Sequence, residues 1–197
     1  GEAQALYSGV QARFVAGTIV YDDGSTVFSI KQENGTEAAV EVLSHQRFQL
    51  AAMTEVSDGR LLLEVVEDGR PVIHAYHARS GALETLNELA TLCSLQGAVW
   101  VDSLDRLACR ERDGADGGVG SYVFADLDGV SVTRPKLPGE GDLLALTYIA
   151  GQDALVFRES WVNSFDGQLK AAIWAHDIQM GKNHVLSDSL NLGTSVV

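Results

Sequence analysis

The sequence predicts an all-β fold built from four successive copies of one antiparallel four-stranded sheet, because its turns, its aromatic spacing and its strand hydropathy agree. Asp-Gly and Asn-Gly steps, which favour the tight turns of β-hairpins, occur eight times. The chain also has 20 glycines but only 3 prolines, a balance typical of many tight turns. The eight steps are Asp23-Gly24, Asn34-Gly35, Asp58-Gly59, Asp68-Gly69, Asp113-Gly114, Asp116-Gly117, Asp128-Gly129 and Asp166-Gly167.

The turns and the aromatic residues recur with a common period, which indicates repeated supersecondary units. Turns that follow equivalent apolar strands are 46 and 48 residues apart, at 57–59, 103–105 and 151–153. Closing turns are 48 and 52 residues apart, at Gly81, Gly129 and Gly181. One aromatic residue falls in the third strand of each copy at spacings of 48, 48 and 50, namely Phe28, Tyr76, Phe124 and Trp174.

Within each copy the turns delimit short strands, and no convincing helix is predicted. The second copy is the clearest, with strands expected at 49–56, 60–67, 72–78 and 82–86. The third copy has strands expected at 98–101, 106–110, 121–125 and 130–133. The fourth has them at 143–150, 154–160, 169–176 and 183–186.

Hydropathy selects how these sheets are arranged. The segments 61–66 and 143–149 are apolar on both faces, whereas a sheet with one wet face would alternate. Sheets that stack radially around an axis cover both faces, so we predict a single-domain β-propeller over residues 1–197. Its blades are expected at about 10–44, 45–90, 91–138 and 139–189. A β-sandwich is the alternative, but it has no reason to repeat at this period.

The first copy is expected to lack an innermost strand, because little apolar sequence precedes Ala12. We therefore expect residues 190–197 to complete the first sheet and close the ring, which would remove exposed strand edges. The alternative is that residues 3–7 supply that strand and the chain is a fragment of a larger propeller. Failure of closure would leave edges that allow a homodimer.

Charge and composition exclude several classes of partner. A formal charge of −13 repels phosphate backbones, so nucleic-acid binding is not expected. No apolar stretch reaches the roughly 18 residues that a membrane-spanning helix needs. Cys93 and Cys109 can form a disulfide in an oxidising compartment, but two buried thiols on neighbouring strands is the simpler interpretation.

The second copy contains the runs Ser57-Asp58-Gly59-Arg60-Leu61-Leu62-Leu63, Glu67-Asp68-Gly69, Ile73-His74-Ala75-Tyr76 and Ser80-Gly81-Ala82-Leu83-Glu84-Thr85-Leu86. Together these runs resemble the repeat of TolB-like β-propellers, to which the propeller domain of prolyl oligopeptidases is also similar. The third and fourth copies match more loosely, the first matches least, and the Gly-His and Trp-Asp pairs of WD-type repeats are absent. The resemblance implies a periplasmic or extracellular protein that binds other proteins. The serine-hydrolase activity of the peptidases is not carried over, because their catalytic domain has no counterpart in this sequence.

No residue pattern points to catalysis, a metal or a cofactor. His74 and His77 are three apart on a predicted strand, so they face opposite sides and cannot bind one ion together. No Gly-x-Ser-x-Gly elbow or Cys–His pair supplies a nucleophile. The glycine-rich segment 114–120 lies between two strands and is interpreted as a hairpin loop; a calcium site at Asp113 and Asp116 is the weaker alternative.

The candidate binding residues are Trp161, Asn163 and Phe165, in the connection between the second and third strands of the fourth copy. The equivalent connection in the second copy is a tight turn. Long loops on rigid scaffolds often bind partners, and exposed aromatic residues anchor interfaces. Packing of Trp161 over a neighbouring sheet is the competing interpretation.

From these observations we expect a non-enzymatic scaffold that binds a protein or small ligand. The alternatives are an enzyme with an axial active site, of glycoside hydrolase, lyase or lactonase type, and a structural segment of a larger protein.

Overall fold

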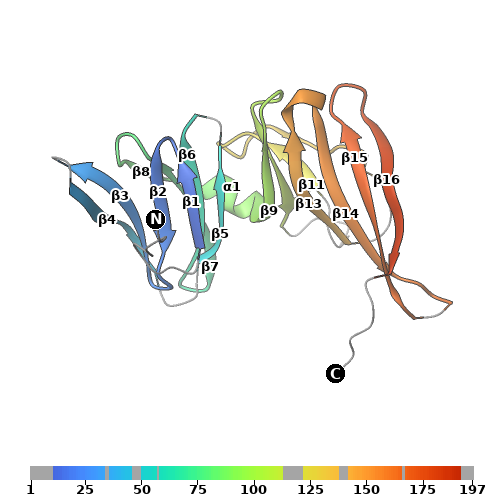
Figure 1. Cartoon of the computed structure of the whole chain (residues 1–197), viewed down its shortest axis with the longest axis horizontal. Helices are drawn as coiled ribbons and strands as arrows, with labels where there is room; N and C mark the ends of the chain where they lie inside the picture. The colour runs from blue at the N-terminus through green and yellow to red at the C-terminus, as the bar shows by residue number, and fades with distance from the viewer. Residues whose placement is uncertain are drawn as a thin grey trace, which may run out of the picture. The chain divides into compact units, whose positions relative to one another are not determined.

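The computed structural model describes residues 11–33, 36–45, 50–56, 58–112, 122–137, 142–165 and 167–191. Over these residues the chain forms four antiparallel four-stranded sheets, each in sequential strand order (Figure 1). The sheets belong to two compact units, residues 1–91 and 92–197, with two sheets in each. The predicted all-β class with four four-stranded blades is confirmed. Closure of a ring is not shown, and a single domain stays a prediction.

The first sheet has its own innermost strand, contrary to the sequence-based expectation. The strand that begins at Gln11 pairs along its whole length with its successor, through a turn at Ala16-Gly17. Ala16 and Gly17 both have positive φ, 46° and 82°, so they supply a hairpin turn without an Asp-Gly step. A search for Asp-Gly and Asn-Gly alone therefore missed this turn. The strands are β1 (Gln11–Val15), β2 (Thr18–Asp22), β3 (Thr26–Glu33) and β4 (Thr36–Ser44).

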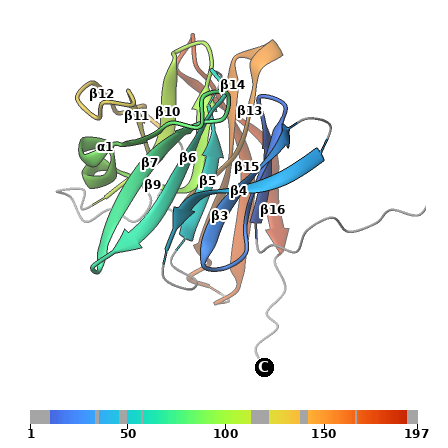
Figure 2. The ribbon, with the colours of Figure 1, turned by 90° about the vertical axis from the view of Figure 1, so that its left-hand side faces the viewer.

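The second sheet follows the predicted boundaries closely, and β5, β6 and β7 lie side by side in Figure 2. Its strands are β5 (Leu50–Glu55), β6 (Arg60–Glu67), β7 (Arg70–His77) and β8 (Leu83–Thr85). A short helix, α1 (Asn87–Leu92), follows, which corrects the expectation of no helix. Its Leu89 and Ala90 are buried, and tertiary burial of this kind stabilises a helix too short to stand alone.

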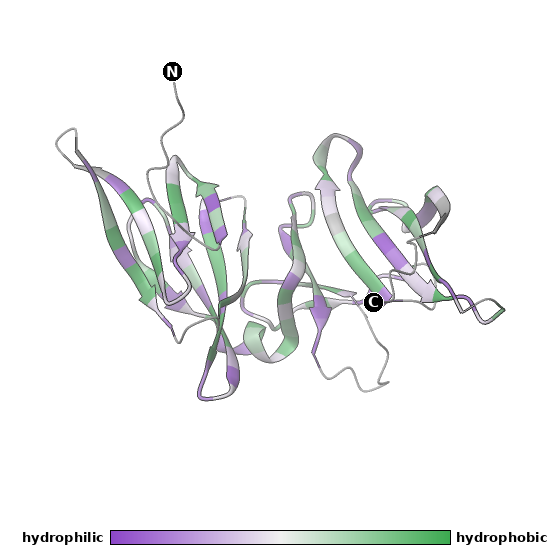
Figure 3. Cartoon of the chain, turned by 60° about the horizontal axis from the view of Figure 1, so that its bottom comes forward, coloured by the Kyte–Doolittle hydropathy of each residue, from purple (hydrophilic) through white to green (hydrophobic). Residues whose placement is uncertain are grey.

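The core of the first unit lies between one face of each sheet. Val15, Val20 and Val27 from the first sheet pack with Leu61 and Leu63 of the second. Hydrophobic residues recur along the strands of the sheets (Figure 3). Leu62 points to the opposite face of β6 from Leu61 and Leu63, yet all three are fully buried. Both faces of this sheet are therefore covered, as the strand hydropathy predicted.

The second unit holds the third and fourth sheets. The third consists of β9 (Cys93–Val101), β10 (Arg106–Glu111), β11 (Tyr122–Ala125) and β12 (Val132–Thr133). The fourth consists of β13 (Asp142–Ile149), β14 (Ala154–Val162), β15 (Leu169–Asp177) and β16 (Lys182–Asn191). Their shared core includes Val101, Phe124, Leu155 and Phe157.

The C-terminal closing strand is corrected in part. Leu190 and Asn191 belong to β16 and pair with Ala171 and Lys170 of β15, so they are part of the fourth sheet and not of the first. The prediction began the closing segment at residue 190 because it ended the fourth copy too early. Residues 192–197 and residues 3–7 lie outside the described part of the chain.

The recurring turns have the backbone conformations that their residues favour. Gly59, Asp105 and Asp153 end the first-to-second strand turns with φ of 82°, 53° and 46°. The closing glycines at 81, 129 and 181 also have positive φ. Among the described Asp-Gly steps, only Asp68-Gly69 has positive φ at both residues, as a type I′ turn requires. The other described steps therefore use turns in which glycine alone is left-handed.

The four recurring aromatic residues all lie in third strands, β3, β7, β11 and β15. Tyr76 and Phe124 are buried in the cores of their units. Phe28 and Trp174 are only partly buried; Phe28 stacks on Tyr21, and the Trp174 Nε1–H donates to a carboxylate oxygen of Glu159 at 2.9 Å. The four aromatic residues therefore recur at the same strand position of each sheet, but their side-chain environments differ.

A buried tyrosine joins the innermost strands of the second unit. The hydroxyl of Tyr122 donates to the carbonyl oxygen of Gly97 in β9 at 3.2 Å. The hydroxyl oxygen of Tyr122 also accepts a hydrogen bond from the backbone N–H of Ala145 in β13 at 2.7 Å. Burial raises the pKa of Tyr122 above its usual value, so the hydroxyl keeps its proton at neutral pH. Because Ala145 is buried, this hydroxyl replaces the water that its N–H would otherwise need.

Cys93 and Cys109 form a disulfide between β9 and β10, with their Cα atoms 5.6 Å apart. This corrects the simpler interpretation of two free thiols. Disulfides persist in oxidising compartments, so the bond indicates an extracytoplasmic environment. No described helix is long and apolar enough to span a membrane.

Two of the recurring turns are linked by a carboxylate. Asp153, in the β13–β14 turn, accepts a hydrogen bond from the Ser103 hydroxyl of the β9–β10 turn. The Tyr148 hydroxyl donates to the same oxygen at 2.8 Å. The Ser103 hydroxyl is the main reason that the pKa of Asp153 lies below its ordinary 3.8, and the Tyr148 hydroxyl adds to the effect.

We expect Tyr122→Phe to lower the free energy of unfolding by about 1–3 kcal/mol, because it leaves the buried Ala145 N–H without an acceptor. Urea unfolding followed by tryptophan fluorescence measures this loss. A change below roughly 0.5 kcal/mol would contradict the bridging role.

Reduction of the disulfide should lower the free energy of unfolding by about 2–4 kcal/mol, because the unfolded chain gains freedom. The measurement is urea unfolding with and without reductant, together with a thiol titration of the denatured protein. The double variant Cys93→Ser/Cys109→Ser is the control and should not respond to reductant. Free thiols in the untreated protein would contradict the bond.

Asp153→Asn tests the charge at the linked turns, since Asn tolerates the same left-handed backbone. At pH 7 we expect a loss of about 1 kcal/mol in unfolding free energy. Because the folded pKa is lowered, the wild-type advantage is complete above 3.8 and disappears as the pH falls through the folded value. Unfolding curves at pH values on both sides of 3.8 check this, and an advantage that does not change with pH would argue against it.

Candidate functional site

The predicted binding residues lie in the β14–β15 hairpin, which extends past the described ends of its neighbouring strands. Ser160 pairs with Asp142, the first residue of β13, and Lys170 pairs with Asn191, the last residue of β16. The residues from 161 to 169 therefore run beyond the described ends of β13 and β16, and Figure 1 shows the hairpin passing the end of β16. The expected loop at 160–165 is corrected in part, because Ser160, Trp161 and Val162 are strand residues of β14.

Asn163 shapes the turn of this hairpin. Its N–H donates to the carbonyl of Gln168 at 2.9 Å, and its own carbonyl accepts the N–H of Gly167 at 2.8 Å. Its side-chain oxygen accepts the N–H of Phe165 at 2.9 Å. This oxygen is therefore occupied by the local turn, as is common for Asn. The Asn163 side chain thus fixes the backbone of the turn at Phe165.

The exposed side chains of the hairpin are mainly apolar. Phe165 is 98% exposed, Val162 is 66% exposed and Leu169 is 41% exposed. We call Val162, Phe165 and Leu169 the hairpin patch. Val162 and Leu169 are direct cross-strand partners, so their side chains share one face of the hairpin.

Trp161 lies on the other face of the hairpin, because strand residues alternate and it pairs with Lys170. It is only partly exposed. The hairpin therefore brings Phe165 into one tip with Val162 and Leu169, while Trp161 faces away from that pair. The sequence reasoning missed Val162 and Leu169, since it treated the first as loop. The turn-forming residues Asn163 and Gly167, which lie between Val162 and Leu169, are the sequence signal that could have placed these two residues on paired strands.

His74, His77 and His176 each have a protein partner. His74 is buried, with its Nε2 at 3.1 Å from Glu67 Oε1 and its Nδ1 at 3.1 Å from Thr85 Oγ1. His77 points to the opposite face of β7 from His74, and its side chain is more exposed than that of His74. Buried His176 contacts Asn183 through its Nδ1 at 2.7 Å. Among the described residues, no three His, Cys, Asp or Glu side chains are grouped to hold a metal ion.

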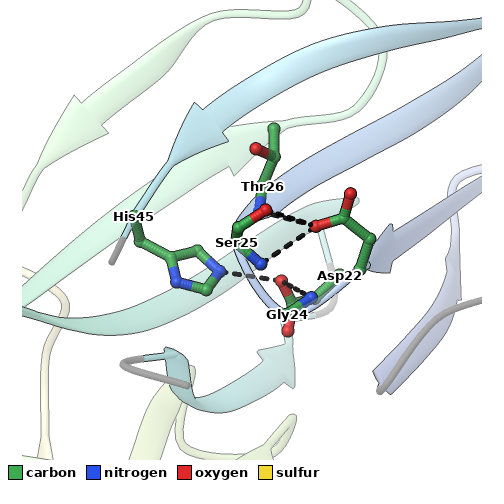
Figure 4. Close-up of polar contacts among 6 residues, drawn as sticks. Asp22, Gly24, Ser25, Thr26 and His45 are labelled. Carbon is green, nitrogen blue, oxygen red and sulfur yellow. Dashed lines mark hydrogen bonds and ion pairs between the residues drawn. The ribbon is translucent and has the colours of Figure 1, made fainter. Parts of the chain in front are cut away.

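A buried Asp–His pair stabilises the first sheet, at the β2–β3 turn (Figure 4). The Nε2 of His45 lies 2.7 Å from Asp22 Oδ1, which also accepts the N–H of Gly24 at 3.0 Å. Asp23 Oδ1 accepts the N–H groups of Ser25 and Thr26, each at 2.9 Å. These N–H donors, Ser25 first, lower the pKa of Asp23. The carboxylates are committed to turn contacts, which is a structural role.

The calcium alternative at Asp113 and Asp116, and the glycine-rich segment 114–120, fall outside the described residues.

No protein-family model matches the sequence, and no curated protein matches it. Solved structures do match it, at low sequence identity. A crystal structure of the tricorn protease aligns with a TM-score of 0.60 and 11% identity over 96% of this chain. An oligogalacturonate lyase in complex with manganese aligns with a TM-score of 0.59 and 14% identity over 89% of this chain.

A putative TolB from Agrobacterium tumefaciens aligns with a TM-score of 0.51 and 16% identity over 92% of this chain. The chain spans 18% of the tricorn protease chain, 52% of the lyase chain and 69% of the TolB chain. Identities this low compare folds and not activities. The predicted likeness to TolB-like propellers is confirmed at the level of fold: the chain has β-propeller architecture.

Proposed function

We propose that this propeller-fold chain is a non-enzymatic scaffold that binds a partner protein through the tip of the β14–β15 hairpin. The observation that carries the proposal is the 98% exposure of Phe165, which Asn163 holds at a defined turn. A large aromatic side chain exposed to water without covering residues gains more from burial against a partner than most surface groups do. Val162 and Leu169 extend the apolar area beside it.

The scaffold beneath the hairpin suits binding without rearrangement. The two strands continue into the fourth sheet through nine paired positions, from Ala154–Asp177 to Val162–Leu169. A site supported by a packed sheet loses little conformational freedom on binding, which favours affinity. The disulfide supports a periplasmic or extracellular location for the scaffold and its partner. No described group of side chains favours the axial enzyme that the sequence left as an alternative.

The test is a comparison of two exposed apolar residues in the second unit. Val130, at the β11–β12 turn, is 77% exposed and serves as the matched control for Phe165. Both Phe165→Ser and Val130→Ser should leave thermal unfolding unchanged, because neither side chain is packed. The purified chain, immobilised, is used to isolate partners from the extracytoplasmic fraction of the source cells, and each retained protein is purified for calorimetry.

We expect Phe165→Ser to weaken the Kd for the partner at least about tenfold, since central aromatic anchors cost more than 1 kcal/mol when removed. Val130→Ser should change the Kd less than about twofold. Equal affinities for the wild type and Phe165→Ser, or loss of binding only in Val130→Ser, would refute the hairpin as the binding site.

A further inference from the structure

An arginine lies on the same face of the fourth sheet as the paired residues of the hairpin patch. Arg158 of β14 pairs with Ile173 of β15, and Val162 pairs with Leu169 in the same ladder, which has no register shift. Cross-strand partners share a face, and so do residues of one strand that are an even number apart. Arg158, Val162 and Leu169 therefore project from one face of the sheet.

This face is opposite the one that packs against the third sheet. Leu155 and Phe157, which alternate with Arg158 along β14, belong to the core that the third and fourth sheets share. Ser160 lies between Arg158 and Val162 on the same face and is half-buried. The three residues form a line along β14 that is about 13 Å long from Arg158 to Val162. We call Arg158, Ser160 and Val162 the β14 line.

The side chain of Arg158 is half-buried, yet it forms no ion pair with any residue that the structure describes. Its Nε is buried and has no hydrogen-bond partner. The other half-buried arginines of the described chain each have a partner. The pairs are Arg60 with Asp58, Arg106 with Asp126, Arg110 with Asp142, and Arg112 with the carbonyl oxygen of Cys93.

The carboxylates beside Arg158 in the sheet have other partners. Asp142 pairs with Ser160 and so shares the face of Arg158, but its carboxylate oxygen lies 2.9 Å from a guanidinium nitrogen of Arg110. Glu159 points to the opposite face and accepts a hydrogen bond from the indole of Trp174. Partial removal of a charge from water without a counter-charge costs free energy, and a carboxylate supplied by a partner would offset that cost.

We propose that the partner of the hairpin patch presents an extended segment with an acidic side chain about four residues from an apolar one. The segment runs along the β14 line, where its carboxylate accepts charge-assisted hydrogen bonds from Arg158 and its apolar side chain covers Val162 and Leu169. Four residues of extended chain span about 13 Å, which matches the length of the line. This inference rests on the proposed function and specifies the chemistry of the partner.

Three acetylated and amidated hexapeptides test the charge of the segment: Glu-Thr-Thr-Thr-Leu-Val and its variants with Gln or Lys in the first place. Each is titrated into the full chain at about 0.15 M salt, and the backbone amide resonances of Val162, Asn163 and Phe165 are followed by NMR. We expect the Glu peptide to bind about fivefold more tightly than the Gln peptide, and the Lys peptide to bind most weakly. The net charge of −13 favours the reverse order, so this order would identify a local cation as its cause.

Substitutions then test the named residues. Arg158→Met should make the Glu and Gln peptides bind equally, and it should not lower the midpoint of thermal unfolding, because Arg158 has no described ion pair to lose. Phe165→Ser should weaken all three peptides, because it removes the apolar anchor. Arg70→Met, at the exposed start of β7, is the control for overall charge and should leave the preference for the Glu peptide unchanged.

The outcomes separate this inference from the proposed function. Equal binding of the Glu and Gln peptides to the wild type, or no shift with the Glu peptide, would overturn the acidic segment. If Phe165→Ser still weakened all three peptides in the case of equal binding, the hairpin patch would stand as the site. If Arg158→Met abolished the preference and Phe165→Ser changed nothing, the acidic segment would stand and the hairpin tip would fail.

Two further results would overturn the role of Arg158. One is a lower midpoint of thermal unfolding in Arg158→Met, because the arginine would then stabilise the fold. The other is loss of the preference in Arg70→Met as well, because the effect would then be one of overall charge.

Discussion

The structure depends on the burial of strands that have no polar face. Leu61, Leu62 and Leu63 are consecutive in β6, so they point to alternating faces, yet none is exposed. A free sheet would leave one of these faces in water, at a cost of roughly 25 cal/mol for each Å² of apolar surface. Sheets that pack on both faces remove this cost. The same constraint operates in the second unit, where β14 contributes Leu155 and Phe157 to the core and also buries Ala154 and Val156.

Two buried polar side chains within these packed sheets have several hydrogen-bond partners. Tyr122 satisfies a backbone donor and a backbone acceptor on two innermost strands, and Asp22 holds His45 and the N–H of Gly24. A buried polar group without a partner costs about 1–3 kcal/mol, so each such contact also favours one arrangement of the strands over others. The polar contacts therefore make the packing specific, while the apolar strands make it stable.

Exposed apolar side chains lie where this packing ends. The β14–β15 hairpin extends beyond the described ends of β13 and β16, and its residues Phe165, Val162 and Leu169 are exposed to solvent. In the first unit, the row of Phe14, Ile19 and Ile30 lies on the sheet face that points away from Val15 and Val20. Rigid strands support both places, which is the usual basis of binding on a β scaffold. The fold thereby exposes apolar side chains at defined positions.

The sequence by itself determined the repeated sheet, because each turn residue and each strand pattern acts locally: glycines at 59, 81, 129 and 181 adopt the positive φ that their turns need. It also singled out Trp161, Asn163 and Phe165 as binding candidates, although not Val162 and Leu169. It missed the Ala16-Gly17 turn, whose left-handed alanine is held there by strand pairing and is not favoured by its own residue type. Only the tertiary structure decided the disulfide, the Tyr122 bridge and the approach of Lys31 to Gly81, because each joins residues from different strands. Such contacts depend on strand register and on bulges, such as the one between Ala108 and Arg110 in the β9–β10 pairing, and no local pattern encodes their geometry.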